Sequence, residues 1–174
     1  MDKQSKTLEI VRRIGAPRAE KIRISGILHS PELALLTVLL PADDGSSSAT
    51  FLSLLGAYRI NVRFISKYED AAGNAVLNVG VEANVVEVTP VDLFQQERAS
   101  IGIKEFSYRP DVRVISIYPH KEQPQVAKQL FATLRLNGIE PLAANNTSSV
   151  ISCVICGQYL QQALSCLEQV FELP

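Results

Sequence analysis

The spacing of apolar residues changes several times along this 174-residue chain, and each change marks a predicted element. Residues 21–28 begin with polar and apolar positions in alternation, which is typical of a strand, and Ser30-Pro31 ends that pattern. Residues 33–40 are apolar at nearly every position, which predicts a strand buried on both faces or lying at a subunit contact. The next apolar residues have helical spacing: Phe51, Leu52, Leu55 and Tyr58.

A hairpin is predicted next. Residues 60–66 form a strand pattern with apolar side chains at alternate positions, and residues 75–81 form another. The segment between them, residues 70–74, has the composition of a turn. We therefore expect the two strands to pair.

Another helix and a short strand follow the hairpin. Thr89-Pro90 predicts a helix start, because a hydroxyl N-cap and a proline at the first helical position both favour initiation. We expect this helix to run through Arg98 and to end near Gly102. Residues 105–108 then predict a short strand that Arg109-Pro110 closes.

The same succession of elements then begins again. Residues 112–117 predict a strand, and Asn137-Gly138 predicts the end of the helix that follows it. That helix has a clear apolar stripe: Val126, Ala127, Leu130, Phe131 and Leu134. Two short strands are predicted around Pro141-Leu142 and at 150–155, with residues 145–149 as their turn. The last predicted helix has an inner face of Leu160, Leu164, Leu167 and Phe171.

The order of elements predicts a nested topology. It is βαββαβ from residue 33 and βαββα from residue 111, so the second unit lacks one strand. Residues 21–28 form the strand left over. If this strand completes the second sheet, the first unit is an insertion within the second.

Composition places the chain among globular proteins. The hydrophobic fraction is 47%, the charged fraction is 20% and the net charge is −1, so nothing indicates a nucleic-acid partner. No apolar stretch approaches the roughly 18 to 20 residues that span a bilayer, and the N-terminus lacks the apolar core of a signal peptide. We therefore expect a cytoplasmic protein without a membrane partner.

The three cysteines favour a structural role. Cys153 and Cys156 form a Cys-x-x-Cys motif, but Cys153 lies inside a predicted strand and not at a helix N-terminus, where a redox pair usually has its first thiol. His29 and His120 are remote in sequence, so no set of zinc ligands is indicated. We expect these cysteines, with Cys166, to be small buried residues, and we expect no metal or cofactor.

The order of elements and four short stretches resemble paired ACT domains, and more closely the regulatory half of aspartate kinases. The stretches are Lys-Ile-Arg-Ile-Ser-Gly-Ile at 21–27, Ile-Asn-Val at 60–62, Glu-Phe-Ser-Tyr-Arg-Pro-Asp at 105–111 and Gln-Val-Ala-Lys-Gln-Leu-Phe at 125–131. The resemblance implies an α+β fold of two ferredoxin-like βαββαβ ACT domains, the first inserted in the second. The expected boundaries are 1–20 for an N-terminal extension, 33–104 for ACT domain 1, and 21–32 plus 105–174 for ACT domain 2.

The resemblance implies regulation and not catalysis. The sequence holds no Gly-x-x-x-x-Gly-Lys-[Ser/Thr] loop and no segment that could form a kinase fold. No nucleophile lies beside a base in the predicted elements. We therefore expect a detached, non-catalytic regulatory module that binds a small amino-acid-type effector.

The resemblance also implies where that effector binds. In the family, an Asp-x-Pro-Gly loop before the first helix and an asparagine at the next strand hold an amino acid, commonly between neighbouring ACT units. On these positions the chain has Asp43, Asp44, Gly45 and Ser46, with Ser47 and Ser48 following, and Asn61, Arg63 and Lys67 in the strand. Gly45 and Ser46 replace the proline and glycine, and Arg63 and Lys67 replace an acidic residue and a glutamine. The two added positive charges indicate a ligand more acidic than lysine or threonine.

Several alternatives stay open. Asp44 and Ser46 could only cap the helix, and Asn61 could only begin a strand. The second loop departs further from the family pattern, since Gln125 takes the glycine position and Glu140 the asparagine position, so we expect a structural role there. We expect a homodimer with residues 33–40 at its seam. The alternative function is a ligand-free scaffold acting on a separately encoded amino-acid biosynthetic enzyme.

Overall fold

The computed structural model describes residues 21–42, 45–83, 97–119 and 124–174. The predicted extension 1–20, the helix start at Thr89-Pro90, and the loop residues Asp43 and Asp44 lie outside these ranges. The described elements are β1 (Ile22–His29), β2 (Leu33–Leu40), α2 (Ser46–Ala57), β3 (Val62–Glu69), β4 (Ala75–Glu82), α5 (Arg98–Ile101), β5 (Glu105–Pro119), α6 (Pro124–Leu136), β6 (Ala143–Asn146), β7 (Ile151–Cys156), the short 3-10 helix η1 (Gly157–Tyr159), α7 (Leu160–Val170) and β8 (Phe171–Glu172).

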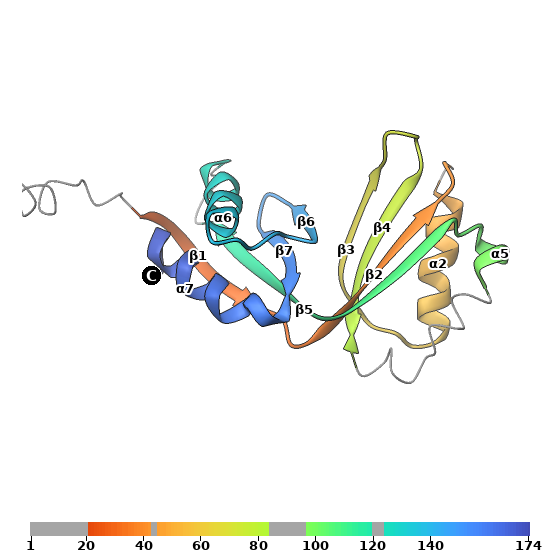
Figure 1. Ribbon diagram of the computed structural model, residues 1–174, viewed down its shortest axis with the longest axis horizontal. Coiled ribbons are helices and arrows are strands. Elements are labelled where there is room, and N and C mark those ends of the chain that lie inside the picture. The colour runs from red at the N-terminus through yellow and green to blue at the C-terminus, as the bar shows by residue number, and fades with distance from the viewer. Residues whose placement is uncertain (1–20, 43–44, 84–96, 120–123) are drawn as a thin grey trace, which may run out of the picture.

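One long strand, β5, runs through both halves of the molecule (Figure 1). Its first part pairs antiparallel with β2, from Glu105 beside Leu39 to Val112 beside Leu33. Its second part pairs antiparallel with β1 on one side and with β7 on the other. In the described residues the strands form one sheet in the order β3-β4-β2-β5-β1-β8, with β7 and β6 joined to β5 as a branch.

The pairing confirms the predicted fold class. One half contains β2, α2, β3, β4, α5 and the start of β5, and the other contains the end of β5, α6, β6, β7, α7 and β1. Ile24 of β1 lies beside Pro119, and Leu28 lies beside Ser116, so the strand left over in the sequence completes the second sheet. Each half is thus an α+β layer of the ferredoxin-like kind.

The prediction of two strands separated at Arg109-Pro110 was wrong, because β5 continues from Glu105 to Pro119. Proline has no N–H for a ladder and is tolerated in strands at bulges. The register of β2 against β5 shifts between Leu33 and Leu35, opposite Val112 and Arg109, and Asp111 has φ 49°. Pro110 therefore falls at an irregularity where a missing donor does not interrupt the strand.

Helix α2 covers one face of the first half (Figure 1). Phe51 and Leu55 are buried at helical spacing and belong to the same core as Leu36, Val38 and other residues of β2 and β4. Each such side chain, when fully buried, contributes about 1.5–3 kcal/mol of hydrophobic stabilisation. Strand β3 begins at Val62, two residues later than predicted, and Ile60 joins this core from the loop before it.

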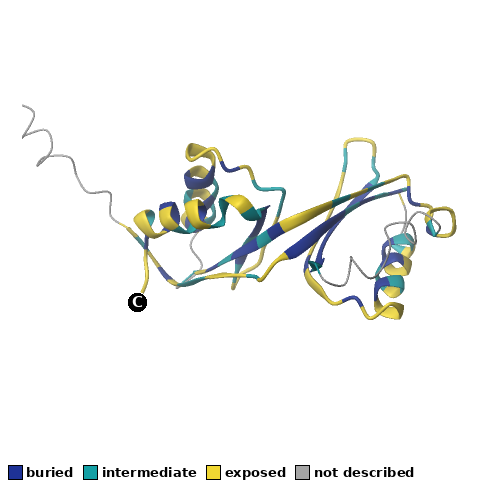
Figure 2. Ribbon diagram, turned by 60° about the horizontal axis from the view of Figure 1, so that its bottom comes forward, coloured by how far each residue is buried: buried dark blue, intermediate teal, exposed yellow. Residues whose placement is uncertain are grey.

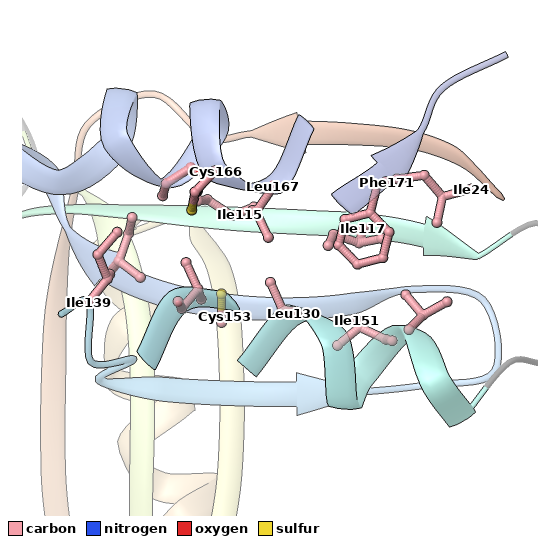
Figure 3. Packing of buried hydrophobic residues seen from close by; sticks show 14 residues of the cluster. Ile24, Ile115, Ile117, Leu130, Ile139, Ile151, Cys153, Cys166, Leu167 and Phe171 are labelled. Carbon is pink, nitrogen blue, oxygen red and sulfur yellow. Dashed lines mark hydrogen bonds between the residues drawn. The ribbon is translucent and has the colours of Figure 1, made fainter. Parts of the chain in front are cut away.

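The second half has its own core, in which α6 and α7 pack on β1, β5 and β7. Leu130, Ile117, Cys153, Leu167 and Phe171 point toward one another there (Figure 3). The inner face of α7 differs from the predicted one, since Ala163, Cys166 and Leu167 are buried whereas Leu160 and Leu164 are only half-buried. The chain leaves the helix at Val170, so Phe171 reaches the core from β8.

A third cluster joins the two halves on the face of the sheet opposite to α2. It contains Leu33, Leu35 and Phe64 from the first half, and Val112, Val114 and Val154 from β5 and β7. Buried residues run along the middle of the long strands in both halves (Figure 2). The expected subunit seam at residues 33–40 was wrong, because β4 and β5 occupy both edges of β2.

Polar contacts hold the chain where β5 crosses between the halves. Arg113 Nη1 donates to Asp111 Oδ1 at 2.9 Å, and Arg113 Nη2 donates to Glu32 Oε2 at 3.2 Å. The Asp111 carboxylate also lies against Gly157, so closely that a Cβ on that glycine would overlap it. Gly157 begins η1 directly after β7. This close approach fixes the start of the last helical segment against the bend in β5.

We predict that Gly157→Ala destabilises the fold, because the new methyl group overlaps a carboxylate that Arg113 holds. Overpacking of this kind costs about 1–3 kcal/mol, and the melting temperature should fall by roughly 2–4 °C for each kcal/mol. The matched control is Gly56→Ala in α2, where no atom lies within 4 Å of the added Cβ. That change should stabilise by about 0.5–1 kcal/mol. Equal melting temperatures for wild type and Gly157→Ala would contradict the packing described.

Candidate functional site

The N-terminus of α2 is the described part of the predicted effector site. Gly45 is its N-cap residue, with φ 98°, a left-handed conformation that favours glycine. The Gly45 carbonyl accepts a hydrogen bond from the Ala49 N–H at 3.0 Å, and Thr50 Oγ1 donates to the Ser46 carbonyl at 2.9 Å. Gly45 has no side chain that could cap the helix, and the first turn of α2 contains no acidic residue. The backbone N–H groups at such an end attract anions.

Strand β3 brings Lys67 to this end of the helix. A Cβ placed on Gly45 would lie 3.8 Å from Lys67 Nζ. Lys67 lies beside Leu77 in the hairpin, and Leu77 lies beside Val38, near the end of β2 that leads into the loop. The structure therefore unites Gly45, Ser46 and Ser47 with Lys67, four of the eight predicted site residues.

Ser48 adds a buried hydroxyl to the same turn. It is 7% exposed, and its Oγ is the buried side-chain polar atom for which the described residues offer no partner. A buried hydroxyl without a hydrogen bond costs about 1–3 kcal/mol. Sequence reasoning grouped Ser48 with its neighbours as a general donor but did not separate it from them. Its spacing of three and seven residues from Phe51 and Leu55 was the signal that it faces the sheet.

Asn61 and Arg63 lie at the other end of β3. Four residues of strand separate Arg63 from Lys67, a rise of about 13 Å. Arg63 Nε and Nη2 both donate to Glu82 Oε1, at 2.9 and 2.5 Å. Glu82 lies beside Leu33, at the end of the sheet remote from the loop. Within one chain, these residues are therefore apart from Gly45.

A cleft of about 270 Å³ lies beside this second end, between β3 and the β6–β7 hairpin. Arg63, Phe64, Asn145 and Ser152 are among the residues that line it. Asn145 Nδ2 donates to the Ile65 carbonyl at 3.0 Å and so ties the hairpin to the edge of β3. Nothing in the sequence indicated this cleft, because residues 145–149 were expected to form only a turn.

The second loop contributes less that can be described. Pro124 begins α6, and residues 120–123, including His120, lie outside the described ranges. Glu140 and Pro141 line a pocket of about 590 Å³ with Phe131 and Arg135 at the far end of the helix. The structural role expected for this loop stays a prediction.

The cysteines do not form a reactive pair. Cys153 is fully buried in the second core, and burial raises the pKa of its thiol to about 12. Burial also raises the pKa of Cys166. Cys156 is half-buried at the end of β7, where Arg109 Nη1 donates to its sulfur at 3.6 Å. Among the described residues, no group of three or more His, Cys, Asp or Glu side chains could hold a metal ion.

Comparison with known proteins identifies the architecture. The aspartokinase of Bacillus sp. (strain MGA3) is 22% identical over 156 residues, which are 88% of this chain and 38% of that protein. The ligand-free regulatory subunit of aspartate kinase from Thermus thermophilus superposes with a TM-score of 0.73 at 21% identity, covering 86% of this chain and 99% of that one. The fold is that of an aspartokinase regulatory subunit. No protein-family model matches the chain.

A complete kinase contains the same fold as one of its parts. Escherichia coli aspartokinase III, in complex with lysine and aspartate in its T-state, superposes with a TM-score of 0.65 at 13% identity, covering 88% of this chain and 34% of that enzyme. The chain thus spans about a third of the length of this enzyme and 38% of the Bacillus aspartokinase. The resemblance to aspartokinase regulatory regions is confirmed. No described helix is long and apolar enough to cross a membrane.

We predict that Cys156 alone reacts rapidly with Ellman's reagent in the native protein at pH 8. A thiol with a pKa of about 12 is almost entirely protonated at that pH, and only the thiolate attacks the reagent. The fast phase should therefore equal one thiol per chain, with the other two released on denaturation. Cys156→Ser should remove the fast phase, whereas Cys166→Ser should keep it. A second fast thiol in the wild type would contradict the burial of either Cys153 or Cys166, and a third would contradict both.

Proposed function

We propose that the chain is a non-catalytic regulatory module that binds a small amino-acid effector at an interface between ACT domains. The observation that carries this proposal is the shared fold with aspartokinase regulatory subunits, one of which is a separate protein from Thermus thermophilus. The E. coli enzyme with lysine bound has the same fold as part of its chain. The similarity to proteins that are themselves regulatory subunits supports a role outside catalysis. We also propose that the protein is cytoplasmic.

The proposed effector site combines opposite charges. The α2 N-terminus and Lys67 suit a carboxylate, because backbone N–H groups and an ammonium both donate to oxygen anions. Asp43 and Asp44 precede them in the sequence and suit an ammonium group. An amino-acid zwitterion carries both groups. The proposed residues are those predicted from the sequence: Asp43, Asp44, Gly45, Ser46, Ser47, Asn61, Arg63 and Lys67.

A second copy would bring the two ends of β3 together. Strand β3 is an edge strand that pairs only with β4 in the described sheet. If the β3 strands of two copies run antiparallel, Asn61 of one copy approaches the Lys67 end of the other. In that register Tyr68, which is 55% exposed, lies in the contact between the two copies. Such a homodimer would couple ligand binding to assembly.

We propose a nested division into two ACT domains, as the sequence indicated. The pairing of Glu105 and Arg109 with β2 favours a boundary inside β5, near Asp111, in place of the expected one after residue 104. The alternative function remains a ligand-free scaffold that acts on a separately encoded amino-acid biosynthetic enzyme. Occupation of Arg63 by Glu82 favours that alternative, since this guanidinium is already paired.

We predict that at least one of the twenty amino acids raises the melting temperature of the full chain. A ligand at a hundredfold excess over its Kd stabilises by about 2.7 kcal/mol, which corresponds to roughly 5–10 °C for a chain of this size. Asp43→Ala should abolish the response, because it removes the proposed partner of the ammonium group. Glu140→Ala, between α6 and β6, is the matched control and should keep it. A flat response to all twenty amino acids would favour the scaffold.

We predict that the protein has twice the chain mass of 19.1 kDa in solution and that Tyr68→Glu makes it a monomer. A charge at the proposed strand-to-strand contact should weaken the dimer by at least about tenfold, the effect expected of an interface residue worth more than 1 kcal/mol. Tyr58→Glu places the same charge on an exposed side chain beyond α2 and should leave the mass unchanged. Light scattering over a range of concentrations measures both. A dimer that Tyr68→Glu leaves intact places the interface elsewhere.

A further inference from the structure

The open edge of β3 is partly covered by the second half of the same chain. In the described sheet β3 pairs only with β4, and β6 pairs only with β7. The free edges of β3 and β6 lie beside each other (Figure 1). Asn145 of β6 bridges them, because its Nδ2 donates to the Ile65 carbonyl at 3.0 Å. This contact joins residues 80 positions apart in the chain and is exposed to solvent.

The Ile65 carbonyl is a group that a second strand would need. Successive residues of an antiparallel strand direct their backbone groups alternately toward and away from one neighbouring strand. The amide of Asn145 reaches Ile65 from the side opposite β4, so the backbone groups of Ile65 face the open edge. The pairing with β4 is regular from Phe64 to Glu69, so Lys67 and Glu69 have the same orientation as Ile65. Such an edge is a template for another strand, and Asn145 occupies one of its acceptors.

Asn145 belongs to a short and exposed strand. β6 has four residues, of which the last three are exposed. The cleft of about 270 Å³ between β3 and the β6–β7 hairpin shows that the hairpin is not tightly packed against β3. In contrast, β7 pairs with β5 along its whole length, from Ile151 to Cys156. The release of Asn145 from Ile65 therefore requires a local movement of β6 and not a movement of the whole second half.

We propose that Asn145 is an internal cap on the edge of β3 and that it competes with a second copy of the chain for the Ile65 carbonyl. This inference rests on the proposed function, because it takes the β3 edge as the seam of the proposed homodimer. In that pairing Asn61 of one copy approaches the Lys67 end of the other, so Ile65 lies inside the paired stretch. A paired strand lies about 4.8 Å from its neighbour, which is where the Asn145 side chain now lies. The closed hairpin thus favours the single chain, and the dimer requires that both hairpins open.

Sedimentation equilibrium of the full chain tests this competition. Asn145→Ala removes the donor, so that neither of the two Ile65 carbonyls in a dimer has to lose a hydrogen bond first. The dissociation constant of the dimer should therefore fall by about fourfold to a hundredfold, the square of the factor for one net hydrogen bond. Asn145→Asp should act in the same direction, because a carboxylate cannot donate to the carbonyl.

Asn146→Ala is the matched control for these variants. It removes the same side chain from the next residue of β6, which is equally exposed and points to the opposite face of the strand. The dissociation constant of this variant should equal that of the wild type. An equal fall in Asn145→Ala and Asn146→Ala would overturn the cap, since the effect would then come from a general loosening of β6.

Hydrogen exchange shows whether the strengthened dimer uses the β3 edge. The backbone amides of residues 65–69 that face the edge should exchange more slowly as the protein concentration rises, and in Asn145→Ala this protection should begin at a lower concentration. The double variant Asn145→Ala/Tyr68→Glu should lose both the dimer and the protection. A double variant that still dimerises without protecting β3 would overturn the competition for this edge.

The remaining outcomes separate the cap from the homodimer. If Asn145→Ala has the dissociation constant of the wild type, or a higher one, and Tyr68→Glu still disrupts the dimer, the cap is overturned while the proposed homodimer stands. If the wild type and Asn145→Ala both stay monomeric at every concentration, the proposed homodimer fails and the cap fails with it.

Discussion

The hydrogen-bonded ladder along β5 is the interaction on which the rest of the structure depends. β5 is the outer strand of the first sheet, beside β2, and then the inner strand of the second, between β7 and β1. Because β1 and β2 follow one another in the chain, they form an almost continuous antiparallel partner for this one strand. The Ser30 N–H donates to the Val114 carbonyl at 2.9 Å where they join. Neither half has a complete sheet without β5, so the two halves should fold as one cooperative unit.

The bend in this ladder sets the relation between the halves. Asp111, with a positive φ, Arg113 and Glu32 form a polar cluster on one side of the bend, and the cluster around Val112 and Phe64 packs on the other. These contacts bring the β6–β7 hairpin to the edge of β3, where Asn145 binds the Ile65 carbonyl. The edge is thereby divided into a part covered within the chain and a part open to another molecule. Natural sheets commonly protect their edges in this way.

The sequence predicted the elements with strong periodicity and the nested order, because side-chain period reports burial directly. The strand end predicted at Pro110 was wrong, because a proline usually ends a strand. The bulge that accommodates it here depends on the neighbouring strands, which the local sequence does not reveal. The role of β2 was open between two alternatives for a similar reason. An all-apolar strand has the same composition at the centre of a sheet as at a subunit contact, and only the pairing distinguishes them. The prediction placed Phe171 on the inner face of the last helix, whereas α7 ends at Val170 and Phe171 reaches the core from β8.

In the candidate site, too, the sequence alone could not show which charged side chains are paired. Arg63 and Lys67 are four residues apart on one strand, and in the sequence they appear as one positive patch. The register of β3 is irregular between Val62 and Phe64, and Arg63 ends beside Glu82, which neutralises it. Lys67 has no such partner among the described residues and faces a helix end whose partial charge has the same sign. The fold, and not the number of cations on the strand, therefore decides that Arg63 is paired while Lys67 has no ion-pair partner among the described residues.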